Sequence, residues 1–201
     1  MSEDTRERIL EACDRLILSI GLSRVTTKEI ARETGLSEGA LYRHFDRKED
    51  VFLSVFEKQV IGLSKTLNAY DAGSGEVKDN LQAICIAILH YYERLIPLTA
   101  SFFADTDLLS RFRELLNRLG SPERLHQRVA HYIEEEKQFG RVVKDILAIS
   151  TAASLLGPAF QYAFLRQLIG KDPFGLSDTQ FVEGLIDVVV PRILSFKEQE
   201  Q

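Results

Sequence analysis

The stretch that decides the fold runs Val25-Thr26-Thr27-Lys28-Glu29-Ile30-Ala31 and resumes, after Gly35-Leu36, as Ser37-Glu38-Gly39-Ala40-Leu41-Tyr42-Arg43-His44-Phe45. Its first half predicts a helix, because the Thr26 side chain can cap the first turn while the Glu29 side chain reaches back to the Thr26 amide. Val25 and Ile30 can close over this start as a hydrophobic staple. Gly35 then predicts the helix end, since glycine adopts the left-handed backbone of a C-cap without steric cost.

A second helix is expected at about residues 38–45, because the Ser37 hydroxyl can cap its first turn. Two short helices joined by a glycine turn make a helix-turn-helix, here at residues 26–45. At about 100° per residue, Leu41 and Phe45 of this second helix point inward together. The outward side then carries Gly39 and Arg43, flanked by Ala40 and Tyr42.

This outward side suits the major groove of DNA. Small side chains let the helix approach closely, Ala40 can meet a thymine methyl, and Arg43 can donate two hydrogen bonds to a guanine edge. Phosphate contacts are expected from hydroxyl, imidazole and ammonium groups and from the amides that begin the first helix; these residues are Thr26, Thr27, Lys28, Tyr42, His44 and Lys48. Glu38 is either repelled by phosphate or accepts from a cytosine amino group, and both readings stay open.

The motif resembles that of the TetR family of transcriptional regulators. The likeness is carried by residues 26–31 and 37–45 and by Lys48-Glu49, and it extends over about residues 5–60. It implies a three-helix DNA-binding domain, residues 3–63, and a larger helical domain, residues 64–201, that binds a ligand and dimerises. Family members commonly turn toward DNA the residues at the positions of Ser37, Gly39, Ala40, Tyr42, Arg43, His44 and Lys48.

Helical periodicity continues through the rest of the chain, since apolar residues recur at spacings of three and four, as in Ile9, Cys13 and Leu16. We therefore predict an all-α protein of about nine helices. Beyond a flexible linker at residues 71–75, helices are expected near 76–95, 98–118, 121–139, 146–169 and 178–195. Ser121-Pro122 and Ser177 are the expected starts of two of them.

The family resemblance also implies a small-molecule inducer, held in a cavity among the helices near residues 98–169. Aromatic and polar candidates for that site are His90, Phe103, Asn117, His126, Phe160, Gln161 and Phe164. The alternative is that none of these residues binds a ligand and that each belongs to the core or to the ordinary surface.

A homodimer interface is predicted on two helices, because small side chains at residues 150–159 permit close helix approach and the last helix carries an apolar stripe. The candidates are Ala152, Ala153, Leu156, Gly157, Phe160, Phe181, Leu185, Val188 and Val189. The alternative is that the small residues fit against a crowded core of the monomer itself.

Composition limits the other classes of function. The 201 residues carry a net charge of -5, whereas residues 24–48 hold six basic and four acidic side chains, a local charge of +2. Cys13 and Cys85 are isolated, and no paired metal-ligand motif, phosphate loop or hydrolase motif occurs. We therefore expect no disulfide, metal, cofactor or catalytic residue. A polar N-terminus and the lack of an apolar run of about 20 residues predict a cytoplasmic protein without a membrane segment.

The sequence thus predicts a cytoplasmic, homodimeric transcriptional regulator that binds double-stranded operator DNA. The resemblance adds that it is a repressor, released from a palindromic operator when an inducer binds the C-terminal domain. The alternative is a helical small-molecule-binding or protein-interaction module without DNA binding.

Overall fold

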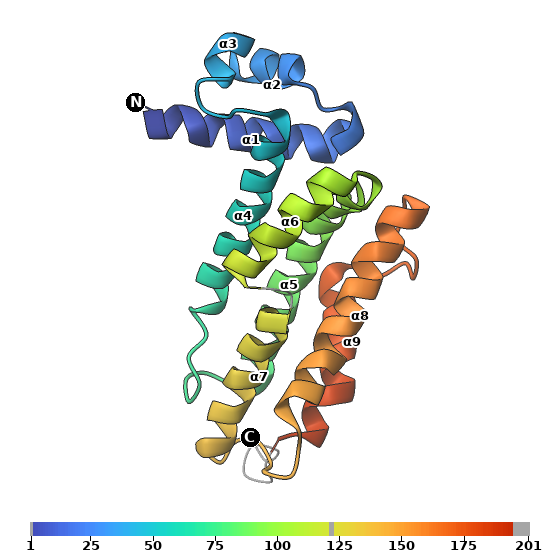
Figure 1. The fold of residues 1–201 in the computed structure, drawn as a ribbon. Helices are drawn as coiled ribbons and strands as arrows, with labels where there is room; N and C mark the ends of the chain where they lie inside the picture. The colour runs from blue at the N-terminus through green and yellow to red at the C-terminus, as the bar shows by residue number, and fades with distance from the viewer. Residues whose placement is uncertain (1, 121–122, 195–201) are drawn as a thin grey trace. The chain divides into compact units, whose positions relative to one another are not determined.

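A computed structural model describes residues 2–120 and 123–194 of the chain (Figure 1). These residues are helical, which confirms the predicted all-α class, and their α-helices are α1 (Ser2–Ile20), α2 (Thr27–Thr34), α3 (Glu38–Leu41), α4 (Lys48–Leu67), α5 (Val77–Ala100), α6 (Thr106–Leu119), α7 (Glu123–Gln138), α8 (Ala148–Ile169) and α9 (Asp178–Val189). Short 3-10 helices cover Leu22–Arg24, Phe102–Ala104 and Val190–Arg192. None of the described helices combines the length and the apolar character needed to span a membrane.

The chain forms two compact units. The first unit comprises Met1–Gly62 and Arg94–Leu119, and the second unit comprises Leu63–Glu93 and Gly120–Gln201. The sequence predicted one division, after residue 63, whereas the first unit also contains a later segment that includes α6. Helical periodicity identifies the apolar face of a helix, but it does not identify which of the two units that face packs into. The functional roles of the domains 3–63 and 64–201 stay predictions.

The core of the first unit gathers apolar faces from α1, α4 and α6. Helix α1 contributes Ile9, Leu10, Cys13, Leu16 and Ile17, which share one face because they are spaced by about one helical turn. The ring of Phe112 lies 4.7 Å from that of Phe56 and 4.8 Å from that of Phe102, centroid to centroid. Burying each such side chain stabilises the unit by about 1.5–3 kcal/mol.

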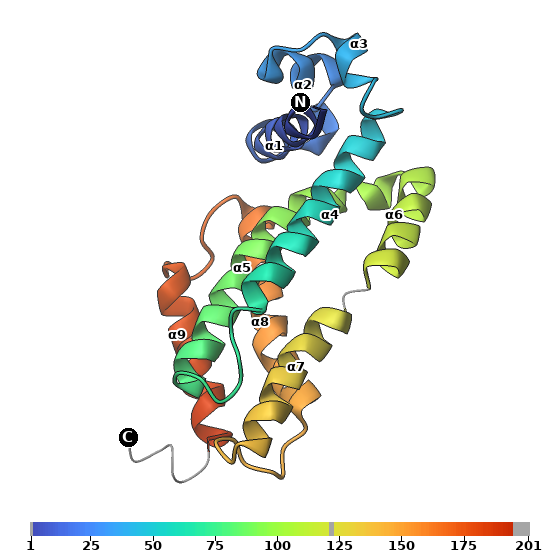
Figure 2. The ribbon, with the colours of Figure 1, turned by 90° about the vertical axis from the view of Figure 1, so that its left-hand side faces the viewer.

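In the second unit, α7 and α8 run side by side and α9 lies against α8 (Figures 1 and 2). Tyr162 of α8 is buried, and its ring stacks on that of Phe181 at 3.9 Å. Cys85 is buried here, as Cys13 is in the first unit, and both are free thiols. Burial raises the pKa of each thiol to about 12, so both stay protonated near neutral pH.

A buried ion pair fixes the segment that the sequence predicted to be a flexible linker. Glu136 of α7 is fully buried and accepts hydrogen bonds from Arg141 Nε at 2.7 Å and from the Gly73 amide at 3.3 Å. Arg141 also donates through Nη1 to the Gly75 carbonyl at 2.6 Å. Residues 71–75 are therefore held at two points, which the sequence did not indicate.

Two predicted helix boundaries also need correction. The helix expected at 98–118 is divided, because α5 continues through Pro97 to Ala100 and α6 begins only at Thr106. Buried Ile96 and Leu98 hold this last turn of α5 in the core, which offsets the hydrogen bond that an interior proline removes. The helix expected at 178–195 ends at Val189 and continues as a 3-10 turn.

The two predicted helix starts have different outcomes. Ser177 caps α9 as expected, in a capping box with Gln180 whose two hydrogen bonds measure 3.2 and 2.9 Å. The predicted start at Ser121-Pro122 lies outside the described residues.

Candidate nucleic-acid interface

The start of α2 is fixed by the capping box that the sequence predicts. The Glu29 amide donates to Thr26 Oγ1 at 3.2 Å, and the Thr26 amide donates to Glu29 Oε2 at 2.8 Å. The Thr26 hydroxyl, which donates to Glu29 Oε2 at 2.5 Å, and then the Thr26 amide hold the pKa of the Glu29 carboxyl below its usual value. Helix α2 then ends at Gly35, whose φ of 69° lies in the left-handed region that favours glycine. Both ends of the first helix of the motif are thus set by local sequence.

Helix α3 is shorter than predicted. Ser37 caps it as expected, because Ser37 Oγ accepts from the Ala40 amide at 3.1 Å, but the α-helix covers only Glu38–Leu41 instead of 38–45. Residues 42–44 continue as a turn. The chain turns here before α4 begins. Asp50 Oδ2 caps the first turn of α4 by accepting from the Arg47 amide at 2.9 Å.

Two buried side chains orient the exposed residues of this turn. Leu41 and Phe45 are 0% and 5% exposed, whereas Tyr42 is 49% exposed and Gly39 and Arg43 also face solvent. This division agrees with the helical-wheel prediction. A Cβ atom added at Gly39 would meet only Ser37 Oγ, at 4.0 Å, so the surface over this residue is open. Contact of these residues with DNA stays a prediction.

A hydrogen bond that the sequence did not indicate joins the two helices of the motif. Thr27 Oγ1 donates to Glu38 Oε2 at 2.6 Å. Both residues occupy the first position of their helices, Thr27 in α2 and Glu38 in α3. The carboxylate therefore has a protein partner in the absence of DNA, and the Thr27 hydroxyl is not free to donate to phosphate in this arrangement.

The other predicted contacts lie around this surface. Thr26, Lys28 and Ser37 are exposed, and Ala40, His44 and Lys48 are half-buried. The Lys48 ammonium lies 5.5 Å from the centroid of the Phe52 ring, an arrangement in which the ring attracts the cation.

Sequence reasoning missed Arg6 of α1. Its guanidinium lies 5.0 Å from the centroid of the Phe45 ring and donates to Ser54 Oγ at 3.0 Å. This arginine places positive charge beside the motif, and no local pattern in the sequence relates residues so far apart along the chain.

The predicted ligand residues are distributed over both units. Phe103 and Asn117 lie in the first unit, and Phe103 is 70% exposed. In the second unit, Phe160, Gln161 and Phe164 lie on the exposed side of α8. The remaining two, His90 and His126, also belong to the second unit. A ligand role for these seven residues stays a prediction.

The predicted dimer residues divide into buried and exposed sets. Ala152 and Leu156 are 0% and 1% exposed, so they belong to the core of the second unit and the interface prediction is wrong for these two. Apolar side chains occupy both the buried and the exposed sides of α8. The sequence alone did not show which of them are buried. Exposed residues of the predicted set are Ala153, Gly157, Phe160 and Val188, and half-buried ones are Phe181, Leu185 and Val189.

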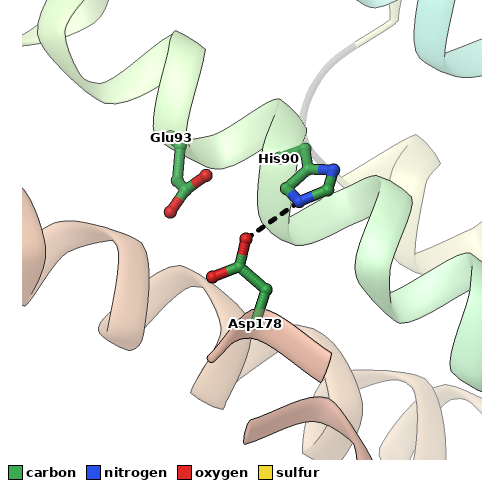
Figure 3. Close-up of side chains that lie close together, drawn as sticks. All are labelled: His90, Glu93 and Asp178. Atoms are coloured by element: carbon green, nitrogen blue, oxygen red, sulfur yellow. Dashed lines mark hydrogen bonds and ion pairs between the residues drawn. The ribbon is translucent and has the colours of Figure 1, made fainter. Parts of the chain in front are cut away.

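Three side chains of the second unit offer ligand atoms to a metal within 4.8 Å of one another: His90 and Glu93 of α5 and Asp178 of α9 (Figure 3). His90 Nε2 lies 3.0 Å from Asp178 Oδ2. However, Arg166 Nη1 makes ion pairs of 2.5 Å with both Glu93 and Asp178. The guanidinium already pairs with both carboxylates, so the cluster is accounted for as an ion-pair network that joins α5, α8 and α9.

Comparison with known proteins identifies the family. The model of "Bacterial regulatory proteins, tetR family" matches residues 9–55, which include the whole helix-turn-helix. The nucleoid occlusion factor SlmA of Pectobacterium carotovorum subsp. carotovorum is 33% identical over 141 residues, 67% of this chain and 71% of that protein. The chain belongs to the TetR family. As a TetR-family member it is a DNA-binding transcriptional regulator rather than an enzyme.

Solved structures show the same TetR fold beyond the motif. A TetR-family transcriptional regulator from Mesorhizobium loti superposes with a TM-score of 0.74 at 16% identity, over 97% of this chain and 99% of that one. A transcriptional regulator from Saccharomonospora viridis, solved in complex with choline, gives 0.74 at 22% identity over 96% and 99%. The chain spans 61% of the length of SlmA from Yersinia enterocolitica, to which it is 33% identical over 121 residues.

Proposed function

We propose that this TetR-family chain is a cytoplasmic, homodimeric repressor that leaves a palindromic operator when a small-molecule inducer binds the C-terminal domain. The observation that supports the DNA-binding role most is the exposed group of Gly39, Tyr42 and Arg43. Buried Leu41 and Phe45 hold this group outward. Caps at both helix starts add rigidity to it.

The roles within this surface differ by residue. Arg43 reads a guanine edge through two hydrogen bonds, and Ala40 meets a thymine methyl. Lys48 and His44 contact phosphate, and so set the register without reading sequence. Glu38 reads no base in this proposal, because its carboxylate is engaged by the Thr27 hydroxyl; its part is to hold α3 against α2.

Two substitutions separate base reading from phosphate contact. Arg43→Ala should weaken binding to the preferred operator by about 1–3 kcal/mol and relax the preference for one base pair. Lys48→Ala should weaken binding to all sequences alike and lower the slope of log affinity against log salt by about 1. Lys65→Ala, which removes a charge from the last turn of α4, is the matched control. Unchanged operator affinity in Arg43→Ala would refute the base-reading role.

The dimer is supported by exposed apolar side chains along α8 and α9. Phe160, Phe164 and Leu168 are 47%, 44% and 67% exposed and follow one another at helical spacing. A pair of such helices from each protomer gives a four-helix interface. The two motifs would then meet successive major grooves, about 34–36 Å apart.

Sedimentation at micromolar concentration tests the dimer. We expect the natural chain to sediment as a dimer and Phe164→Glu to sediment as a monomer, because a charge would be buried without a partner. Phe139→Glu is the control, since Phe139 is 63% exposed and follows the end of α7. A natural chain that stays monomeric would contradict the proposal.

The inducer acts through differential affinity. A ligand shifts the equilibrium only if it binds the form that has left DNA more tightly than the operator-bound form. Choline, present in the related Saccharomonospora viridis structure, is a rational first probe in a wider screen that measures operator affinity. A screen in which no compound changes that affinity would count against an inducer.

The likeness to the nucleoid occlusion factors supports a second candidate function, because the alignment covers 67% of this chain and thus extends well past the motif. In this case the DNA-bound protein would act in nucleoid occlusion rather than on a promoter. The genomic positions of bound sites distinguish the two: a repressor occupies promoters, whereas an occlusion factor occupies sites spread independently of transcription starts.

A further inference from the structure

The helix-turn-helix joins α4 through a very short segment. Phe45 is buried with the motif, and only Asp46 and Arg47 separate it from the first residue of α4. Two linking residues leave little room for independent movement, so the direction in which α4 starts also sets the orientation of α3. A side chain that fixes this start can therefore affect DNA binding without contacting DNA.

Asp50 fixes the start of α4 and is itself held by α6. Its Oδ2 accepts from the Arg47 amide at 2.9 Å and so caps the first turn of α4. Its Oδ1 accepts from Nη2 of Arg111, a residue of α6. The side chains of Asp50 and Arg111 are each 27% exposed, so salt screens this ion pair less than it screens a fully exposed one. Arg111 thus acts on the cap of α4 through one carboxylate.

A cavity beside this ion pair makes the pair an important link between α4 and α6. The open space measures about 270 Å³ and is bordered by residues of both helices, including both members of the pair. The ring contact between Phe56 and Phe112 comes six residues later on α4, about 9 Å along the helix. A second ion pair between α6 and this junction joins Arg47 Nη1 to Asp107 Oδ2 at 3.9 Å and is largely exposed, so it contributes little.

The burial of Arg111 costs part of the stability that its ion pair contributes. Its other amino group, Nη1, is buried and makes no hydrogen bond to any described residue. An unsatisfied buried donor costs free energy, which offsets part of the gain from the pair. Such donors are rare in native proteins and are expected mainly at functional sites. Stability alone therefore does not account for the placement of Arg111.

We propose that Arg111 is a positioning residue for operator binding. Through Asp50 it holds the first turn of α4, and thereby the angle at which α3 presents Arg43 to the major groove. It does not itself contact DNA. The DNA-binding domain predicted at residues 3–63 thus depends on a residue of α6 for its full affinity. This inference rests on the proposed reading of an operator by α3, because operator affinity is its first readout.

DNA-binding measurements on Arg111→Met and Arg113→Met test the inference. Both variants lose one positive charge from α6, but Arg113 is exposed and does not border the cavity. We expect Arg111→Met to bind the operator about tenfold or more weakly than Arg113→Met does. The two variants should bind random-sequence DNA within about threefold of each other, because that binding depends on charge rather than on exact position. Equal operator affinity of the two variants would overturn the inference.

Further variants show whether Arg111 acts through Asp50. Arg111→Lys should bind the operator within about threefold of the natural chain, because an ammonium can replace the single amino group that the pair uses. Asp50→Asn keeps an acceptor for the cap but loses the counter-charge, so alone it should bind as weakly as Arg111→Met. Adding Arg111→Met to Asp50→Asn should then lower operator affinity by less than about twofold. A further tenfold loss in the double variant would show that Arg111 acts by another route, and would refute the inference.

Hydrogen exchange without DNA separates a failure of this inference from a failure of the proposed function. In Arg111→Met the amides of residues 42–50 should exchange about threefold or more faster than in the natural chain, whereas Arg113→Met should leave them unchanged. Circular dichroism at the same temperature confirms that each variant is folded. If the natural chain selects no operator but this exchange rises, the proposed function fails and the positioning by Arg111 stands. Unchanged exchange at residues 42–50 would contradict the positioning role itself.

Discussion

Replacing Glu136 by glutamine should destabilise the second unit severely. The carboxylate is fully buried and accepts from Arg141 Nε at 2.7 Å, from Arg141 Nη2 at 2.5 Å and from the Gly73 amide at 3.3 Å. In the Glu136→Gln variant an amide nitrogen faces a donor, and the guanidinium, whose side chain is 17% exposed, loses its counter-charge. Both effects leave buried groups without partners.

The expected magnitude follows from this burial. Breaking a buried ion pair by removing one partner costs about 3–5 kcal/mol. A protein of this size loses about 2–4 °C of Tm for each kcal/mol, so Tm should fall by about 6–20 °C. Urea unfolding followed by far-UV circular dichroism at neutral pH measures the change in the free energy of unfolding.

Two further variants make this test specific. Lys78→Ala breaks an exposed 2.8 Å pair with Asp187 in the same unit and should cost less than about 1 kcal/mol. Combining Glu136→Leu with Arg141→Met should restore part of the loss, because no uncompensated charge remains buried. A Glu136→Gln protein within about 1 kcal/mol of the natural chain would refute the reasoning.

Three other predictions concern the motif and the second unit. Thr26→Ala should lower the free energy of unfolding by about 0.5–2 kcal/mol, because it removes the cap of α2; an unchanged urea midpoint would contradict this. Glu38→Gln should raise affinity for all DNA sequences alike without altering the preferred site, since it removes a negative charge near phosphate; a changed preference in a binding-site selection would show that Glu38 reads a base. Tyr162→Phe should raise the pKa of Asp172, which is held low first by the Tyr162 hydroxyl and then by Arg166. That stabilisation is present above the ordinary carboxyl pKa of about 3.9 and is lost as the pH falls below that value. The difference in the free energy of unfolding between the natural chain and the variant should therefore shrink from neutral pH toward about pH 3. A difference independent of pH would argue against this role of Tyr162.

The sequence predicts the motif well because its determinants are local. The capping box of Thr26 and Glu29, the cap at Ser37 and the glycine turn at Gly35 each depend on residues within three or four positions. Burial of Leu41 and Phe45 follows from helical spacing. The length of α3 was overestimated, since the cap that Asp50 gives to α4 was not recognised.

The features that the sequence did not reveal are long-range. The Thr27–Glu38 bond, the contact of Arg6 with Phe45 and the pairing of Arg111 with Asp50 join residues 11 to 61 positions apart. No periodicity encodes such pairs, because each depends on how helices are placed against one another. For the same reason the sequence could not tell which residues of α8 face the core and which face solvent.

The central claim is that the exposed surface at Gly39, Tyr42 and Arg43 reads an operator. Selection of fragments from the genome of the source organism by the purified protein, repeated at several salt concentrations, tests it most directly. We predict a shared near-palindrome with half-sites one helical turn apart, and its loss from the fragments that Arg43→Ala selects. Recovery of fragments without a shared sequence, at every salt concentration, would contradict the claim.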